Sequence, residues 1–339
     1  MSKPLLIWGA GAIGASLGAA FLRAGQDVVF VDTDADHVAA MNRDGLTIQG
    51  PVHPDHQSVI AYLPGDLPGL YDCVFLCVKA LHTKAAIVAL VPHLTEDGYV
   101  VSAQNGLNEK VIVDHIGAAR TVGCFVNFGA DYLSPGVVHY SGRGAVVIGE
   151  LDGVQSPRIL GLHSLMLTFD DRAVLTDNIW GYLWGKMTYG ALLFGTALTD
   201  DSIVDILDGD DCRAVLTALG QETGAVAASE GVTPMGFDGF DPAAFAPHAP
   251  QAALDRSFDE MVAHNRTSTK THSGIWRDLA VRKRKTECEA QLGPIVSTGR
   301  LNGVPTPLTE RLMAMIAQIE QGERPLFRDN LKELAEVML

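Results

Sequence analysis

The first half of the chain alternates short apolar runs with stretches whose apolar residues recur every three or four positions. Residues 5–8 are continuously apolar and are followed by glycine, which is typical of a buried parallel strand. Residues 12–24 carry the helical spacing, and Gly25 is expected to end that helix. This alternation predicts a doubly wound α/β sheet made mainly of parallel strands. Further strands are expected at 27–31, 73–78, 99–103 and 121–126, and further helices at 35–43 and 84–91.

The pattern changes in the middle of the chain. The segments 136–142 and 144–149 flank Arg143, and we expect them to form an antiparallel hairpin that closes one edge of the sheet. Beyond them the apolar spacing is helical, apart from a loop rich in Gly, Pro and Ala at 231–250. The helices expected there are 180–194, 211–230, 254–264, 283–302 and 308–321.

The length of 339 residues allows two domains of ordinary size. We place an α/β domain at 1–177 and an all-α domain at 178–339. Hydrophobic residues make up 47% of the chain and charged residues 19%, as in ordinary globular proteins. The five cysteines are odd in number and form no Cys-x-x-Cys pair, so we predict neither a disulfide framework nor a metal site.

The formal net charge of −15 argues against two classes of partner. Nucleic acids and anionic membranes both need a basic surface, so we expect neither as a partner. No apolar run approaches the roughly 18 residues of a membrane span, and the N-terminus does not resemble a signal peptide. We therefore expect a cytoplasmic protein, in which an anionic substrate needs local positive charge.

A glycine motif, Gly9-Ala10-Gly11-Ala12-Ile13-Gly14, joins the first predicted strand to the first predicted helix. In this position it indicates a Rossmann-type, dinucleotide-binding unit. Gly9 permits a tight turn, Gly11 lets the backbone approach a pyrophosphate, and Gly14 lets the helix pack closely on the strand. The pyrophosphate is then expected at the helix N-terminus, where the helix dipole favours an anion.

Asp32 ends the second predicted strand. A carboxylate in this place accepts hydrogen bonds from the ribose hydroxyls of NAD and repels the 2′-phosphate of NADP. The neighbouring Thr33, Asp34 and Asp36 add no positive charge. The sequence therefore favours NAD(H) over NADP(H), although Asp32 can also be read as an exposed turn residue.

Three further polar residues stand where chemistry is expected. Lys79 and Asn105 follow predicted strands, and the carboxyl ends of such strands form the ligand crevice of an open α/β sheet. Lys186 is the one basic residue in an aromatic and apolar run, and burial would lower its pKa from about 10.4 toward a value that suits proton donation. The alternatives are a solvated lysine at 79, an Asx turn at 105 and a snorkelling lysine at 186.

Taken together, the order and spacing of these motifs resemble the ketopantoate reductase (2-dehydropantoate 2-reductase) family over most of the chain. The resemblance implies reduction of the ketone of a 2-oxo acid with a nicotinamide cofactor, which in this family is usually NADP(H). It also implies a homodimer, with substrate and dimer contacts on the second domain. The matching segments are 9–14, 76–80, 104–107, 136–149, 183–186 and 273–287.

The resemblance also implies roles for individual residues. Lys186 matches the family's general acid, and Glu287 matches an active-site glutamate that orients ligand hydroxyls and the lysine. Lys79 and Asn105 match residues that line the cofactor and substrate cleft. Ser273 falls where the family places a serine that contacts the substrate carboxylate.

Several positions depart from the family pattern. Gly190 stands where an asparagine usually follows the lysine, and a second asparagine is missing around Phe194. The stretch 278–287 is one residue longer than usual, so the serine match is shared between Ser273 and Gly274. The basic run 282–285 is interpreted as a solvated helix face or as a source of positive potential for a carboxylate substrate.

These observations lead to one main hypothesis and three alternatives. The main hypothesis is an NAD(P)-dependent oxidoreductase that acts on a small 2-oxo or 2-hydroxy acid, with Lys186 as the proton donor. The first alternative is a related 2-hydroxy acid dehydrogenase whose substrate is not pantoate. The second is a catalytically silent nucleotide-binding regulatory protein, and the third is a flavin or S-adenosylmethionine user, for which no additional motif is present.

Overall fold

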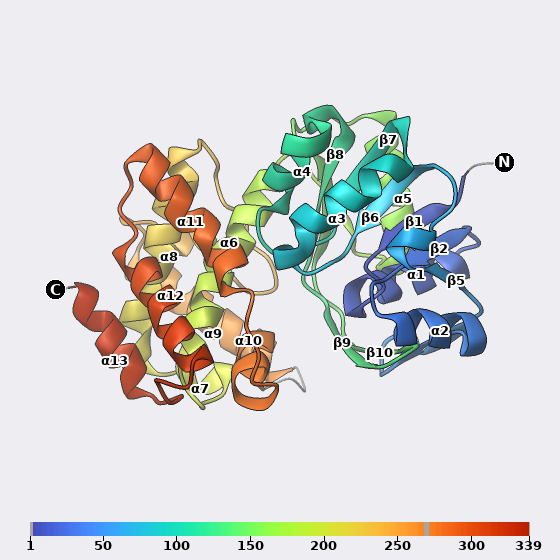
Figure 1. Cartoon of the computed structure of the whole chain (residues 1–339). Helices are drawn as coiled ribbons and strands as arrows, with labels where there is room; N and C mark the ends of the chain where they lie inside the picture. Colours follow the sequence, from blue (N-terminus) through green and yellow to red (C-terminus); the bar gives the residue numbers. More distant parts are fainter. Residues whose placement is uncertain (1–2, 268–270, 339) are drawn as a thin grey trace. The chain divides into compact units, whose positions relative to one another are not determined.

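The computed structural model describes residues 3–267 and 271–338. The chain divides into two compact units, Met1–Ile179 and Trp180–Leu339 (Figure 1). The first unit contains a large sheet with helices on both faces, and the described part of the second unit is helical. The predicted combination of a Rossmann-type α/β sheet with an all-α region is confirmed.

The large sheet has eight strands in the order β12-β11-β8-β7-β6-β1-β2-β5. From β5 to β8 all neighbours pair in parallel, and β11 then runs antiparallel to β8. The chain adds β2 and β5 on one side of β1 and then β6, β7 and β8 on the other, so the order reverses next to β1 and β6. The strands are β1 Leu5–Trp8, β2 Val28–Val31, β5 Ile60–Tyr62, β6 Tyr71–Leu76, β7 Leu94–Ser102, β8 Thr121–Val126, β11 Val146–Glu150 and β12 Val174–Leu175.

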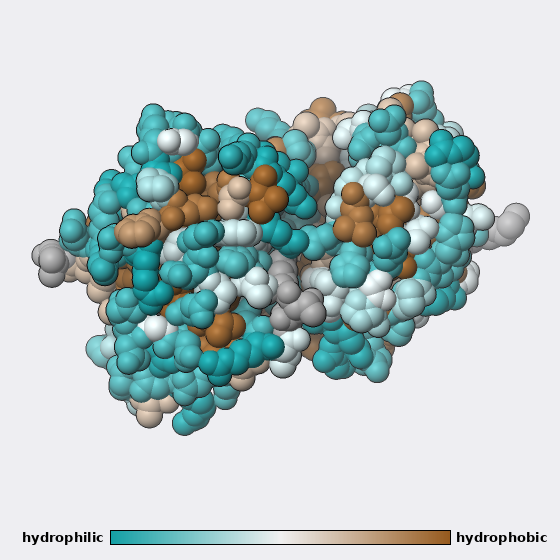
Figure 2. Space-filling view, turned by 90° about the horizontal axis from the view of Figure 1, so that it is seen from below, coloured by the Kyte–Doolittle hydropathy of each residue, from teal (hydrophilic) through white to brown (hydrophobic). Residues whose placement is uncertain are grey.

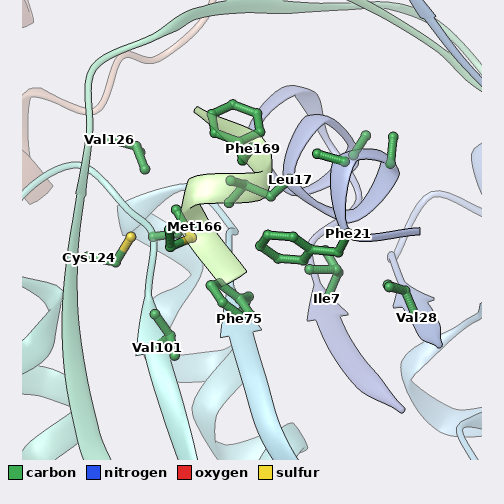
Figure 3. Packing of buried hydrophobic residues seen from close by; sticks show 14 of the residues in the cluster. Ile7, Leu17, Phe21, Val28, Phe75, Val101, Cys124, Val126, Met166 and Phe169 are labelled. Carbon is green, nitrogen blue, oxygen red and sulfur yellow. The ribbon is translucent and has the colours of Figure 1, made fainter. Parts of the chain in front are cut away.

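Two hydrophobic cores lie on opposite faces of this sheet. The helices α1 (Ala12–Arg23) and α5 (Pro157–Phe169) cover one face, and α3 (Thr83–Leu90) and α4 (Asn108–Ile116) cover the other (Figure 1). Side chains alternate along a strand, so Ile7 of β1 enters the first core while Leu6 and Trp8 enter the second. Figure 3 shows Phe21 of α1 beside Phe75 of β6, with ring centroids 5.1 Å apart.

The predicted hairpin around Arg143 is wrong. Its first half is β10 (Val137–Gly142), which pairs with β9 (Gly129–Ser134) and with β3 (Leu46–Gln49) in a second sheet of order β4-β3-β10-β9. Its second half is β11, which pairs with β8 and β12 in the large sheet. The remaining strand of this sheet is β4 (Asp55–Gln57), and the helix α2 (Ala35–Asp44) packs against β5 of the large sheet.

The turn residues explain why no hairpin forms around Arg143. Pro135-Gly136 connects β9 to β10, and Gly136 has φ +75°, so the tight turn forms there and not at Arg143. All five residues of β11 are buried, which fits a strand inside the covered large sheet, where it lies between β8 and β12. The Asn127 N–H donates to the Ala145 carbonyl at 2.8 Å, which continues the antiparallel pairing from one sheet into the other.

The second unit is built on long helices with buried apolar faces. On α8, for example, Cys212, Val215, Leu216 and Leu219 are all buried at helical spacing. The helices are α6 Ile179–Thr196, α7 Ile203–Leu207, α8 Asp210–Ser229, α9 Gln251–Arg266, α10 Gly274–Trp276, α11 Cys288–Asn302, α12 Pro307–Glu320 and α13 Asp329–Ala335.

The helix predicted over 283–302 begins later, at Cys288. A π-helical turn, Arg277–Val281, precedes it, and the basic run 282–285 lies in the loop between them. Arg282 and Arg284 both donate to Asp278, at 3.1 and 2.9 Å. These ion pairs fold the chain back on itself, and the interpretation of the run as a helix face is therefore wrong.

The surface of the chain mixes hydrophilic and hydrophobic residues. On the face shown in Figure 2, hydrophobic residues form separate patches among hydrophilic ones. None of the helices within 3–267 and 271–338 is both long and apolar enough to cross a bilayer. The same residues contain no group of three or more His, Cys, Asp or Glu side chains arranged to hold a metal ion.

Candidate active site

The loop between β1 and α1 is shaped by two glycines that packing requires. Gly9 has φ +100°, and a Cβ there would lie 2.8 Å from the backbone nitrogen of Val78. A Cβ on Gly14 would overlap the Gly9 carbonyl oxygen and lie 2.7 Å from Ile7 Cγ2. Gly11 differs, because apart from its chain neighbours no described atom lies within 4 Å of where its Cβ would be. The loop is therefore open at Gly11 and closed by packing at the other two glycines.

The N-terminus of α1 suits an anion. Gly11 is its N-cap and supplies no side-chain hydrogen bond, and the first turn of the helix contains no acidic residue. The first N–H groups of a helix lack partners within it and carry the positive end of its dipole. The open space at Gly11 and this helix end together fit a dinucleotide pyrophosphate.

Asp32, directly after β2, is tied to the glycine loop. One carboxylate oxygen accepts the Ala10 N–H at 2.8 Å, and the other accepts the Asp34 N–H at 3.0 Å. The carboxylate is half-buried, and both oxygens have acceptor capacity beyond these bonds. Its position beside the glycine loop suits hydrogen bonding to ribose hydroxyls.

Buried His37 holds the same loop from the other side. Its Nε2 lies 2.8 Å from the Ala10 carbonyl oxygen, and the Gly136 N–H donates to its Nδ1 at 2.9 Å. A backbone N–H only donates, so Nδ1 carries no proton and Nε2 is the donor. The imidazole thus links the glycine loop to the turn between β9 and β10. Sequence reasoning missed His37.

Lys79 and Asn105 lie at the same end of the sheet as the glycine loop. The strand register pairs Trp8 with Leu76 and Leu76 with Ser102, so β1, β6 and β7 end side by side. Lys79 and Asn105 come a few residues after β6 and β7, and both are exposed. The structure therefore brings the glycine loop, Asp32, Lys79 and Asn105 to the carboxyl ends of neighbouring parallel strands.

Lys186 lies near the middle of α6, in the second unit. Trp184 and Met187 beside it are buried, with 0% and 4% exposure, whereas Lys186 itself is half-buried. The Thr188 hydroxyl donates to the Trp184 carbonyl at 2.9 Å, within the helix. The predicted burial holds for Leu183 and Trp184, whereas Trp180, Tyr182 and Lys186 are half-buried.

Gly190, one turn after Lys186, faces open space. Apart from its two chain neighbours and the helix's own backbone, no described atom lies within 4 Å of where its Cβ would be. Next to it, the Tyr189 hydroxyl accepts a hydrogen bond from Asn265 Nδ2 at 3.2 Å, and burial raises the pKa of this phenol. Position 190 therefore has room for a side chain.

Glu287 is the residue immediately before α11. Its neighbour Thr286 is anchored to the last residue of α12, because both the Thr286 N–H and its hydroxyl donate to Glu320 Oε1, at 2.8 and 2.6 Å. The Thr286 hydroxyl oxygen also accepts the Cys288 N–H at 3.2 Å. These bonds fix the backbone on either side of Glu287.

Ser273 has a capping role in this structure. Its hydroxyl oxygen accepts the Trp276 N–H at 3.1 Å, which caps α10, and the residue is 5% exposed. Lys186, Ser273 and Glu287 therefore all belong to the second unit, on α6 and on the segments that start α10 and α11.

Comparison with known proteins places the chain in a family. Residues 5–153 match the family described as Ketopantoate reductase PanE/ApbA, and residues 178–320 match Ketopantoate reductase PanE/ApbA C terminal. A 2-dehydropantoate 2-reductase from Archaeoglobus fulgidus is 27% identical over 318 residues, which cover 93% of this chain and 97% of that protein.

Solved structures resemble the chain over nearly its whole length. A PanE/ApbA family ketopantoate reductase from Ralstonia eutropha JMP134 has a TM-score of 0.77 at 26% identity, over 95% of this chain and 99% of that one. A D-mandelate dehydrogenase, in a ternary structure with NADH and anilino(oxo)acetate, is similar in fold, with a TM-score of 0.82 at 19% identity and the same coverage.

The Rossmann-type sheet with its glycine loop, followed by a helical second unit, defines a class of oxidoreductase. Within that class, the chain belongs to the ketopantoate reductase PanE/ApbA family. The resemblance described from the motifs is thereby confirmed.

Proposed function

We propose that this protein transfers hydride between a nicotinamide cofactor and C2 of a small 2-oxo or 2-hydroxy acid. The glycine loop carries the proposal, because packing explains Gly9 and Gly14 but leaves Gly11 open at a helix N-terminus that suits a pyrophosphate. Membership of a ketone-reducing family supports the type of reaction.

The residues proposed to hold the cofactor are on the first unit. Residues 9–14 would bind the pyrophosphate, and Asp32 would accept hydrogen bonds from the adenosine ribose. Asp34 and Asp36 follow Asp32 at the start of α2, and these carboxylates would repel a 2′-phosphate bound near them. We therefore propose NAD(H) as the preferred cofactor, with NADP(H) as the alternative that family resemblance offers.

The residues proposed to act on the substrate come from both units. A bound nicotinamide supplies the hydride for reduction or accepts it in the reverse direction. Lys186 donates its proton to the substrate oxygen as that oxygen becomes an alkoxide, and takes a proton from the hydroxyl in the reverse direction. Glu287 orients Lys186 and ligand hydroxyls. Lys79, Asn105 and Ser273 bind the polar groups of the substrate.

A substrate other than ketopantoate is favoured by one observation. Gly190 replaces an asparagine that the family usually has one turn after the lysine, and the space there is open. We expect Gly190→Asn to fold normally and to change the ratio of kcat/KM between ketopantoate and other 2-oxo acids by about tenfold, the effect of one polar contact of about 1.4 kcal/mol. An unchanged ratio would show that position 190 does not contact the substrate.

The test of the reaction is a screen of NADH and NADPH oxidation with a panel of 2-oxo acids, ketopantoate included. Turnover with at least one acid is expected, with higher kcat/KM for NADH. A strong preference for NADPH would overturn the role of Asp32. Tight NADH binding without turnover of any 2-oxo or 2-hydroxy acid would instead favour the regulatory alternative. We also propose a cytoplasmic homodimer, whose mass in solution is measurable by light scattering.

A further inference from the structure

A buried chain of hydrogen bonds connects the two loops that carry Lys79 and Asn105. Gln104 Nε2 donates to the Val78 carbonyl at 2.8 Å and to Thr83 Oγ1 at 2.8 Å. The Thr83 hydroxyl donates to Asn108 Oδ1 at 2.7 Å, and Asn108 Nδ2 donates to the Asn105 carbonyl at 2.6 Å. The three side chains of Gln104, Thr83 and Asn108 are defined here as the loop clamp.

The loop clamp joins equivalent places in two successive strand–helix units. Thr83 is the first residue of α3 and Asn108 is the first residue of α4, and these helices pack against each other. Gln104 lies between β7 and α4. Exposures of 4%, 1% and 6% for Gln104, Thr83 and Asn108 keep the clamp out of solvent, where such bonds are strong and broken ones are costly.

The two ends of the clamp are backbone carbonyls beside the proposed site residues. At one end is the Val78 carbonyl, whose peptide group continues into Lys79. At the other is the carbonyl of Asn105 itself, before Gly106 turns the chain with φ +97°. Both site side chains are exposed while their backbones are tied to one buried group, so the clamp sets the spacing between them.

We propose that Gln104, Thr83 and Asn108 are positioning residues that fix Lys79 and Asn105 relative to each other for catalysis. This inference rests on the proposed function. Thr83 is the central group, since its hydroxyl both accepts from Gln104 and donates to Asn108. A displacement of about 1 Å in positioning groups can lower turnover by about 100-fold, so a small loosening of the clamp is measurable.

The test compares three variants. Thr83→Val keeps the shape of the side chain and removes both hydrogen bonds, whereas Thr83→Ser keeps the hydroxyl. Thr121→Val is the matched control, because Thr121 is also fully buried and its hydroxyl donates to a backbone carbonyl, that of Gly117 at 3.0 Å, away from both loops. For each we would measure kcat/KM, Tm, and amide hydrogen exchange in 79–82 and 105–108.

We expect Thr83→Val to lower kcat/KM by about 10- to 100-fold, with Thr83→Ser within about threefold of the wild type. Exchange should quicken in both loops of Thr83→Val together, and in neither loop of Thr121→Val. The proposal is overturned if Thr83→Val loses no more kcat/KM than Thr121→Val at a similar Tm, or if exchange quickens in only one loop. Should the wild type reduce no 2-oxo acid, the proposed function fails, and exchange alone still decides whether the clamp couples the two loops.

Discussion

The two units place their candidate residues in different ways. In the first unit, the glycine loop, Asp32, Lys79 and Asn105 each follow a parallel strand, and the register of β2, β1, β6 and β7 brings those strand ends together. In the second unit, Lys186 lies within a helix, and Ser273 and Glu287 lie at the starts of two others. The topology of the sheet determines where the candidate residues of the first unit lie. The positions of Lys186, Ser273 and Glu287 depend instead on how particular helices of the second unit pack.

A second difference concerns how packing and ligand binding are divided among residues. In the glycine loop the division is sharp, since Gly9 and Gly14 touch neighbouring backbone and Gly11 does not. In the second unit the roles overlap, as Ser273 shows by capping α10 with the hydroxyl oxygen that the family resemblance assigns to substrate binding. In the glycine loop, adding a single methyl group by a Gly→Ala substitution can therefore distinguish an effect on folding from an effect on cofactor binding.

Gly14→Ala has the largest expected effect on folding. The new methyl would overlap the Gly9 carbonyl oxygen and lie 2.7 Å from Ile7 Cγ2, both of which are buried where α1 meets β1. We expect the free energy of unfolding to fall by about 3 kcal/mol or more, as for overpacked cores. Urea denaturation measures it. A variant as stable as the wild type would show that α1 can move away from the sheet.

Gly11→Ala is expected to affect the cofactor and leave the fold intact. The methyl would occupy space that the protein leaves open, so the free energy of unfolding should change by less than about 1 kcal/mol. Cofactor affinity should fall about 10- to 100-fold, which corresponds to about 1.4–2.8 kcal/mol, because the methyl blocks close approach of a pyrophosphate. NADH titration by fluorescence checks this. If instead Gly11→Ala destabilises the protein as much as Gly14→Ala does, or binds NADH as tightly as the wild type, the division of roles is wrong.

A smaller effect, on the pH dependence of stability, is expected from the carboxyl of Glu109, the second residue of α4. It is 0% exposed, and burial raises the pKa of its carboxyl to about 8. The Glu109 backbone N–H and the Ser102 hydroxyl act to lower the pKa, but burial outweighs them, and neither carboxyl oxygen has a hydrogen-bond partner among the described residues. The folded protein therefore favours the neutral acid, and ionisation of Glu109 opposes folding.

The pH dependence follows from the direction of this shift. Below the ordinary pKa of 4.5 the carboxyl is neutral in both the folded and the unfolded chain, so it does not change the free energy of unfolding at those pH values. From 4.5 to about 8 the unfolded chain loses the proton and the folded chain keeps it, so stability falls by up to roughly 1.4 kcal/mol per pH unit. Glu109→Gln should remove this slope, while the exposed Glu96→Gln should not. Parallel pH profiles of Tm for both variants and the wild type would contradict the account.

Much of the first unit was predictable because its signals are local. The strands β1 and β8 match their predicted ranges, and the glycine motif and Asp32 occur where strands end. The helix α5 is absent from the predicted elements, although Ile159, Leu162 and Met166 have helical spacing. The hairpin prediction failed because an apolar run indicates a buried strand but does not determine which strand it pairs with.

Other features depend on contacts between distant residues. His37 bonds to Ala10 and to Gly136, which are 27 and 99 residues away, so no local pattern reveals its role. The late start of α11 depends on two arginines that converge on Asp278, and the anchoring of Thr286 depends on Glu320, 34 residues further along. Such contacts form only when the helices pack, and the sequence alone does not specify that packing.

The central claim is that the first unit binds the cofactor and that Lys186 of the second unit transfers the proton. The most direct test measures NADH affinity and kcat for Lys186→Ala, with Lys332→Ala on the surface of α13 as the control. We predict that Lys186→Ala binds NADH nearly as tightly as the wild type while kcat falls by about 10²- to 10⁴-fold, and that Lys332→Ala changes neither. A Lys186→Ala enzyme with near-normal kcat would contradict the account.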